Sequence, residues 1–189
     1  METDSIDYLD GLDAAIYYAK ELVNIKYGFR ERNQADDGAP DFAKNGPPPH
    51  RGRITKISNV GLINLIFRKA GVLLPETEKH GIGTVNSYID VYRDCRSLRP
   101  YPVGESKYHK DSVQYPVGTL FLREERTKDD AGYIAIKADE HNNLLQSFWV
   151  NNIFGLWCPG VNMVYDLEAT HDDYLFEYYV LPQDWLKTI

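Results

Sequence analysis

Residues 58–71 read SNVGLINLIFRKAG, an apolar stretch with a polar start and a glycine at its end. Four of its apolar side chains recur at the spacing of a helix that packs one face on a core: Leu62, Leu65, Ile66 and Ala70. Ser58 or Asn59 can cap the amino end of this helix, because a short polar side chain accepts a hydrogen bond from a free amide there. Gly71 can adopt the left-handed backbone that closes a helix. We therefore predict a helix over residues 57–71.

Two further segments carry the same helical spacing. In residues 5–27 the apolar positions lie at steps of three and four, and Tyr27-Gly28 offers a glycine at the end: Leu9, Leu12, Ile16, Ala19, Leu22 and Val23. Residues 84–95 place Val85, Tyr88, Ile89 and Tyr92 on one face. Residues 31–53, between the first two helices, are rich in turn residues and contain Pro47-Pro48-Pro49. We interpret them as a loop that is disordered or packs on the surface, ahead of a loop with a binding role, because their polar residues do not converge on one site.

The second half of the chain has the composition of strands. We predict strands over residues 117–122, 133–137, 144–149 and 174–181, with a hairpin turn over residues 139–143. Helices that come first and strands that follow are typical of an α+β fold. No repeat or change of composition divides the chain, so we expect one domain over residues 1–189 with its sheet in residues 117–186.

Composition limits the classes of function. The 189 residues are 43% hydrophobic and 26% charged, the range of an ordinary globular domain. A net charge of −7 argues against a nucleic-acid partner. The acidic amino terminus lacks the apolar segment of a secretory signal, and no stretch is apolar enough to span a membrane. We therefore expect a protein of the cytoplasm or of a virus particle, with no disulfide framework from its two cysteines, Cys95 and Cys158.

The order of these segments matches what a cysteine hydrolase needs. Its thiol stands at a helix amino terminus, where the dipole and free amides lower the thiol pKa. An imidazole from another element takes the proton, and a third polar group orients that imidazole. Helix, loop, strand, turn and strand follow here in that order.

The motifs themselves resemble those of the NlpC-type papain-like cysteine peptidases and related cell-wall amidases. The matching segments, in chain order, are Tyr27-Gly28, residues 58–71, Gly118-Thr119-Leu120-Phe121, Gly132-Tyr133-Ile134-Ala135, Leu145-Gln146-Ser147 and the closing residues 181–186. The resemblance spans residues 27–186 and implies a papain-like fold, with amino-terminal helices packed on an antiparallel sheet.

The catalytic positions of this family are replaced. The resemblance places Asn59 at the nucleophile, Tyr133 at the base, Gln146 at the orienting residue and Thr119 where the family has aspartate. An amide is no thiolate, and a phenol with a pKa near ~10 is no base at neutral pH. We therefore predict no catalytic residue. Tyr27, Asn59, Tyr133 and Gln146 would line the former cleft, with Asn59 capping its helix and the Tyr133 hydroxyl bonded to Gln146.

Other sites are less well supported by the residues. Cys158 with His171 could form a relocated dyad of an active peptide or cell-wall amide hydrolase, whereas Cys95 ends a helix, where the dipole raises a thiol pKa. The histidines lack metal-ligand spacing, so we expect no metal and no cofactor: His50, His80, His109, His141 and His171.

Two functions without catalysis fit these observations. The first is an inactive binding or structural module that joins a protein partner or a larger assembly such as a virus particle. The second is a module whose former cleft binds a peptide-like ligand without cleaving it, through Asn59, Tyr133 and Gln146.

Overall fold

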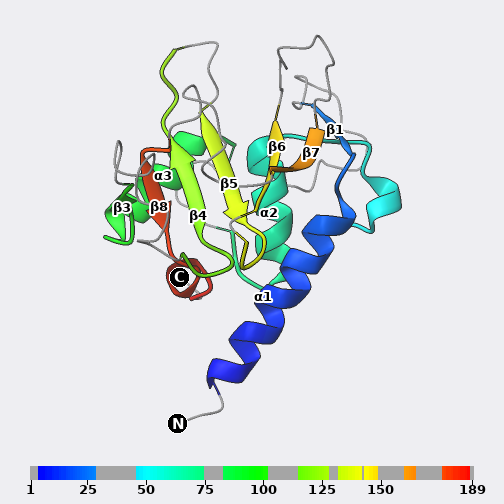
Figure 1. Ribbon diagram of the computed structural model, residues 1–189, viewed down its shortest axis with the longest axis horizontal. Coiled ribbons are helices and arrows are strands. Elements are labelled where there is room, and N and C mark those ends of the chain that lie inside the picture. Colours follow the sequence, from blue (N-terminus) through cyan, green and yellow to red (C-terminus); the bar gives the residue numbers. More distant parts are fainter. Residues whose placement is uncertain are drawn as a thin grey trace.

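The computed structural model describes residues 4–28, 46–74, 83–101, 115–127, 132–141, 143–148, 160–164 and 176–187. Within these residues four α-helices accompany an eight-stranded sheet (Figure 1). In chain order the elements are α1 (Asp4–Glu21), β1 (Lys26–Tyr27), a 3-10 turn (Arg51–Arg53), β2 (Lys56–Ile57), α2 (Asn59–Lys69), α3 (Val85–Asp94), β3 (Arg99–Pro100), β4 (Leu120–Arg123), β5 (Tyr133–Lys137), β6 (Leu144–Phe148), β7 (Gly160–Val164), β8 (Tyr178–Val180) and α4 (Pro182–Trp185).

The sheet has the strand order β2-β1-β7-β6-β5-β4-β8-β3. Its pairs are antiparallel except that β1 and β2 run parallel, so the sheet is mixed and the expectation of an antiparallel sheet was wrong at this edge. The mixed helix-and-sheet architecture agrees with the predicted α+β class.

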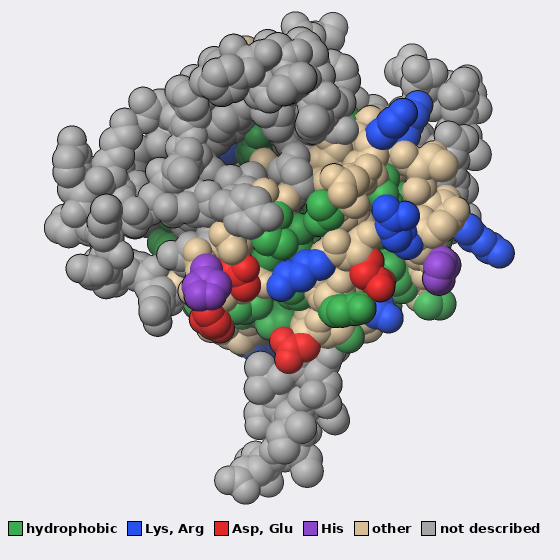
Figure 2. Space-filling model, turned by 45° about the vertical axis from the view of Figure 1, so that its right-hand side comes forward, with side chains coloured by type: hydrophobic (Ala, Val, Ile, Leu, Met, Phe, Trp, Pro, Cys, Tyr) green, Lys and Arg blue, Asp and Glu red, His purple; other side chains and the backbone are tan. Residues whose placement is uncertain are grey.

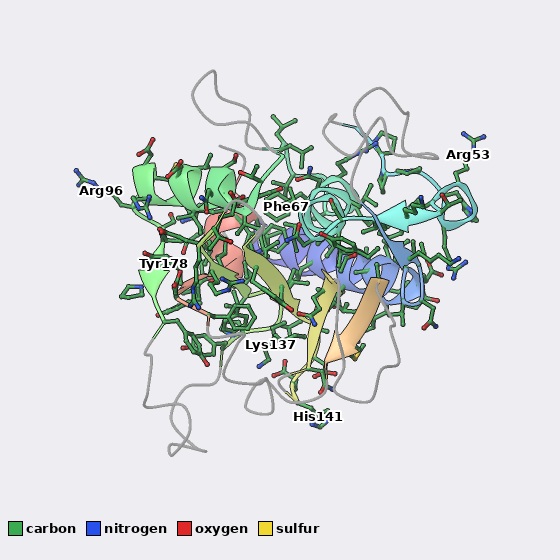
Figure 3. All side chains as sticks on the ribbon, turned by 90° about the horizontal axis from the view of Figure 1, so that it is seen from above. Arg53, Phe67, Arg96, Lys137, His141 and Tyr178 are labelled. Carbon is green, nitrogen blue, oxygen red and sulfur yellow. The ribbon has the colours of Figure 1, made fainter. Side chains whose placement is uncertain are left out.

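The two faces of the sheet bury different side chains. Alternate residues of β4, β5 and β6 pack with α1, α2 and α3 in what we call the helix-side core: Leu120, Leu122, Ile134, Ile136 and Leu145. The intervening residues form a second cluster, which we call the aromatic face: Phe121, Tyr133, Ala135 and Leu144 with Tyr115 and Phe176. Figure 3 shows this division, since Phe67 of α2 and Lys137 of β5 lie on opposite sides of the strands.

Helix α2 has the capping residues that the sequence predicts at both ends, Ser58 and Gly71. The Ser58 hydroxyl accepts a hydrogen bond from the amide of Gly61 at 3.0 Å, so Ser58 is the cap. At the other end Gly71 has a φ of 77°, and the amides of Gly71 and Val72 bond the carbonyls of Arg68 and Phe67. This is the paired closure that a left-handed residue allows. The helix covers 59–69, two residues shorter at each end than predicted.

The first helix stops earlier than its apolar pattern suggested. It ends at Glu21, and Asn24 turns the chain with a φ of 73°, a left-handed conformation that asparagine tolerates better than most residues. The carbonyl of Ile25 then accepts a bond from the amide of Val161 at 2.8 Å. Residues 22–27 were therefore wrongly assigned to the helix, because the chain turns over residues 22–24 and then pairs with β7.

The strands differ from prediction mainly at their starts. Residues 133–137 are a strand as predicted, and β6 pairs with this strand in antiparallel orientation. Residues 117–119 are a turn and not strand, since Gly118 has a φ of 87° and the Thr119 hydroxyl bonds the carbonyl of Pro116 at 2.7 Å. The last strand covers only Tyr178–Val180 of the described residues, and β1, β2, β3 and β7 were not predicted.

Helix α4 joins α2 to the turn before β4, mainly through Trp185. Trp185 is fully buried, stacks on Phe67 of α2 with ring centroids 4.6 Å apart, and donates from its indole nitrogen to the carbonyl of Gly118 at 2.8 Å. Asp184 accepts a hydrogen bond from Arg99 at 2.5 Å. These contacts join residues that lie more than sixty positions apart in the chain. No described helix combines the length and the apolar character needed to cross a bilayer.

Candidate functional site

The amino terminus of α2 meets the start of β5 through Asn59. This side chain is 5% exposed. Its amide oxygen accepts a hydrogen bond from the amide of Val60 at 2.7 Å, and its amide nitrogen donates to the carbonyl of Gly132 at 3.4 Å. Both ends of the Asn59 side chain therefore bond backbone groups, while Ser58 acts as the cap.

Gly132 makes this approach possible. It has a φ of 69°, and a Cβ there would lie 2.8 Å from the carbonyl oxygen of Arg123. Only glycine fits both conditions without strain. The glycine before Tyr133 therefore sets the entry of the chain into β5, and this role requires no catalytic chemistry.

Tyr133 lies on the aromatic face. Its side chain is 3% exposed, and it packs edge-to-face against Phe176 with centroids 6.2 Å apart. The guanidinium of Arg123, directly opposite in the register of β4, lies 5.5 Å from the ring centroid. The ring is thus a packing element between an aromatic neighbour and a cation.

Gln146 points to the same face as Tyr133. It follows Leu144 of the aromatic face by two residues and is buried, and it stands opposite Asn162 in β7. The structure therefore brings Asn59 to the peptide group that precedes Tyr133, and places Tyr133 and Gln146 on one face. The predicted hydrogen bond between the Tyr133 hydroxyl and Gln146 stays a prediction.

Tyr27 lies near the β2 edge of the sheet, away from Tyr133 in β5. It is half-buried in β1, opposite Ile57 of β2, and β7 separates β1 from the strand of Gln146. Burial raises the pKa of the Tyr27 phenol well above its usual value. A neutral phenol donates and accepts hydrogen bonds but cannot act as a base at neutral pH.

Two polar residues of this region were not singled out from the sequence. Ser147 has no exposed surface, and its hydroxyl donates to the carbonyl of Ile57 at 2.6 Å, which ties β6 to the residue just before the Ser58 cap. Lys137 is 1% exposed on the aromatic side of β5, where its ammonium donates to the carbonyl of Tyr115. Burial lowers the pKa of Lys137, an effect that Glu140 and Asp139 partly oppose. Its position in an otherwise apolar strand was the available signal.

The remaining candidates do not add a catalytic group to the described region. His50 and His141 are both exposed, and Cys95 is an exposed free thiol at the carboxyl end of α3. Cys158, His171, His80 and His109 lie outside the described residues. Among the residues that are described, no three histidine, cysteine or acidic side chains form a group that could hold a metal.

Comparison with protein-family models, with curated proteins and with solved structures finds no match to this chain. The chemistry of the site therefore follows from its own residues. At the junction of α2 and β5 these are an amide and a phenol, which form hydrogen bonds and pack. Neither supplies a nucleophile or a base at neutral pH.

Proposed function

We propose that this chain is a catalytically inactive, NlpC-type peptidase-like protein that works as a binding or structural module in a larger assembly such as a virus particle. The proposal rests on the burial of the Asn59 side chain and on its hydrogen bonds to backbone groups. A catalytic side chain at this helix terminus would have to face a substrate, whereas the Asn59 amide is buried and bonds Val60 and Gly132.

The packing of the Tyr133 ring supports the same function. The position where the resemblance expects a base holds an aromatic ring packed against Phe176 and Arg123. Positions 59 and 133 both contribute to packing or to backbone bonding, which suits a fold retained for contacts and not for turnover.

The surface charge fits a protein partner better than a polyanion. In the view of Figure 2, acidic and basic side chains of the described residues are interspersed among apolar ones. The whole chain carries a net charge of −7. A phosphate backbone favours a surface with a concentration of positive charge, which this composition does not supply.

Thiol reactivity tests the loss of chemistry. We expect neither cysteine of the folded protein to react faster than free cysteine with a maleimide or an epoxide probe at pH 6, a pH at which such a probe detects an activated thiolate. A Cys95→Ser variant isolates Cys158, and a Cys158→Ser variant isolates Cys95. A single thiol that reacts at pH 6 about a hundredfold faster than free cysteine would overturn the proposal and favour a relocated hydrolase with Cys158 and His171.

A second experiment tests the resemblance itself. We expect an Asn59→Cys variant to carry a thiol activated by the helix terminus, and Asn59→Cys with Tyr133→His to react faster still because the imidazole takes its proton. Circular dichroism would establish that both variants are folded. Equal thiol reactivity in the two folded variants would count against the assignment of residues 59 and 133 to the catalytic positions.

A further inference from the structure

The β2 edge of the sheet carries four exposed basic side chains, which we call the basic edge: Lys26 of β1, Arg51 and Arg53 of the 3-10 turn, and Lys56 of β2. Lys26 and Lys56 are partners in the parallel register of the two strands, so they are neighbours across the ladder. No ion pair within the described part of the chain involves any of the four. Because like charges side by side on neighbouring strands lower stability, the basic edge suits a surface that an acidic group covers.

The chain has an excess of basic residues in this region and an excess of acidic residues elsewhere. Residues 46–74 contain five basic residues and no acidic one, whereas the rest of the chain contains 16 basic and 28 acidic residues. In Figure 2 most basic side chains of the described surface lie on its right-hand side. A long polyanion laid on the basic edge would also meet the acidic remainder, which repels it. A short acidic segment of a protein avoids that repulsion and therefore fits this surface better.

The opposite charge lies at the amino-terminal end of α1. Residues 1–13 contain no lysine or arginine, and their aspartates recur at steps of three: Asp4, Asp7, Asp10 and Asp13. In Figure 1 this end of α1 extends past the other described elements, whereas the carboxyl end leads into β1 and the basic edge. A helix of 18 residues is about 27 Å long, so the acidic end lies far from the basic edge of the same copy.

The helix dipole explains only part of this distribution. Acidic residues stabilise a helix amino terminus and basic residues a carboxyl terminus, but the effect falls off within one turn. Asp10 and Asp13 lie beyond the first turn of α1, and Arg53 and Lys56 belong to other elements. The molecule therefore has two regions of opposite charge at the two ends of α1, each suited to a partner of the other sign.

We propose that the basic edge of one copy binds the acidic amino-terminal end of α1 in a second copy, so that copies join head to tail. The two surfaces differ, so the contact is heterologous. Such a contact closes into a ring or continues as a chain, according to the rotation between copies. This contact would be one joint of the assembly proposed above, and it does not depend on the loss of catalysis at Asn59.

Self-association at low and high salt is the first test. Exposed ion pairs are individually weak, so the wild-type protein is followed by sedimentation from about 10 µM to about 1 mM. The Debye length falls from about 30 Å at 0.01 M salt to about 3 Å at 1 M. We expect the weight-average mass to rise with protein concentration in 0.01 M salt, and the dissociation constant to be at least about tenfold higher in 0.5 M salt. A protein that stays monomeric in low salt, or that associates equally in both salts, would overturn the proposal and leave the thiol test of the proposed function unaffected.

Two pairs of neutral substitutions locate the contact. Lys26→Gln with Lys56→Gln weakens the basic edge, and Asp7→Asn with Asp10→Asn weakens the acidic end of α1. We expect each pair to raise the dissociation constant of self-association about fivefold to tenfold in low salt, because each removes two of the charges that face the other copy.

The matched control removes the same charge elsewhere. Arg96→Gln with Lys187→Gln neutralises two exposed basic side chains, and Figure 3 labels Arg96 at the end of the molecule opposite Arg53. Its dissociation constant should stay within about twofold of the wild-type value. The variant with Asp7→Asn and Asp10→Asn separates local contact from net charge, because it makes the acidic chain less negative and general repulsion would then predict tighter association. Equal weakening in the control and the basic-edge variant, or tighter association in the acidic-end variant, would overturn the proposal.

Mixing the two weakened variants tests the head-to-tail order. The basic-edge variant keeps an intact acidic end, and the acidic-end variant keeps an intact basic edge. One wild-type contact can therefore form between them, so we expect an equimolar mixture to form a mixed dimer with about the wild-type dissociation constant and few larger species. Circular dichroism would establish that both variants are folded, and if either is not, the salt test of the wild-type protein decides alone. A mixture of folded variants that associates no better than its components would overturn the proposal.

Discussion

Asn59 illustrates how a buried side chain at a helix amino terminus can bond backbone groups at both of its ends. Helix amino termini favour negative charge, so electrostatics alone would make aspartate an improvement there. The contact with the carbonyl of Gly132 needs a donor, however, and a carboxylate has none. The electrostatics of the helix terminus favour aspartate at position 59, whereas the loss of the amide donor disfavours it. The Asn59→Asp variant measures which effect is larger.

We predict that Asn59→Asp lowers the free energy of unfolding at pH 7 by about 1–3 kcal/mol, because the buried carboxylate faces the oxygen of Gly132. The loss should shrink as the pH falls and the new carboxyl gains a proton that it can donate. Urea titrations at pH 7 and pH 4 would measure both values. Ser58→Asp is the control, since aspartate caps helices well, and its change should stay within about 0.5 kcal/mol.

Lys137 carries the second prediction at this scale. Its pKa is lowered from 10.5 by burial, so the unfolded chain holds the proton more firmly than the folded one. Stability that depends on this residue is complete above pH 10.5 and falls as the pH drops toward the folded-state pKa.

We therefore expect Lys137→Met to flatten the rise of the free energy of unfolding between pH 7 and pH 10. At pH 7 the variant should be at least as stable as the wild-type protein, by up to about 1–4 kcal/mol. Chemical denaturation across this pH range would show it. Lys26→Met, at an exposed lysine of β1, should retain the pH dependence of the wild-type protein. An unchanged pH slope in Lys137→Met would contradict the role assigned to its burial.

At the scale of the elements, Gly71 closes α2 by conformation alone. A Cβ there would meet nothing within 4 Å, yet the φ of 77° is left-handed. We expect Gly71→Ala to destabilise the protein by about 1 kcal/mol. Gly83 is the matched control, because its surroundings are equally open and its φ is ordinary, so Gly83→Ala should be neutral or slightly stabilising. Thermal denaturation of the two variants would distinguish backbone strain from crowding.

The tryptophan of α4 is a test of packing between elements. Trp185→Ala should cost about 3–5 kcal/mol, since it removes a fully buried indole from its stack on Phe67. Trp185→Phe should cost less, because the stack is kept and the bond to Gly118 is lost. Leu73, which is 50% exposed, provides the control, and Leu73→Ala should change stability by less than about 0.5 kcal/mol.

Which elements could be predicted depends on the local pattern that each carries more than on length alone, since β7 has five residues like β5 and was not predicted. The eleven residues of α2 carry a helical period, the continuous apolar run of β5 indicates a buried strand, and the caps Ser58 and Thr84 mark helix starts. The two-residue strands β1, β2 and β3 have no period of their own and exist because a partner backbone lies beside them. No local pattern could have located them.

The candidate site could be predicted only in part, because some of its contacts follow from the order of motifs and others depend on the folded structure. The approach of Asn59 to the start of β5 followed from the order of motifs, and the positive φ of Gly132 accounts for the glycine before Tyr133. The burial of Lys137 and the contacts of Arg68 with Gly46 and Pro47 depend on which surfaces meet in three dimensions. Spacing along the chain does not encode them.

At the scale of the whole molecule, the sheet is assembled from distant parts of the chain. β1 and β2 join it only through β7, whereas β3 and β8 join it through β4. The connection at β7 is unusually close, since a Cβ on Gly160 would lie 2.1 Å from the carbonyl oxygen of Ile25. One glycine therefore controls whether the amino-terminal strand pair can dock on the rest of the sheet.

We predict that Gly160→Ala detaches β1 and β2 while β4, β5 and β6 stay paired, because the added methyl group cannot fit against the backbone at Ile25. Hydrogen exchange should then show lost protection in residues 25–28 and 56–58 and retained protection in 133–137. Gly83→Ala, in open space, should leave both regions protected. Equal loss across the sheet would mean that the strands unfold as one cooperative unit, so that a local clash at β7 destabilises the whole molecule and not one edge.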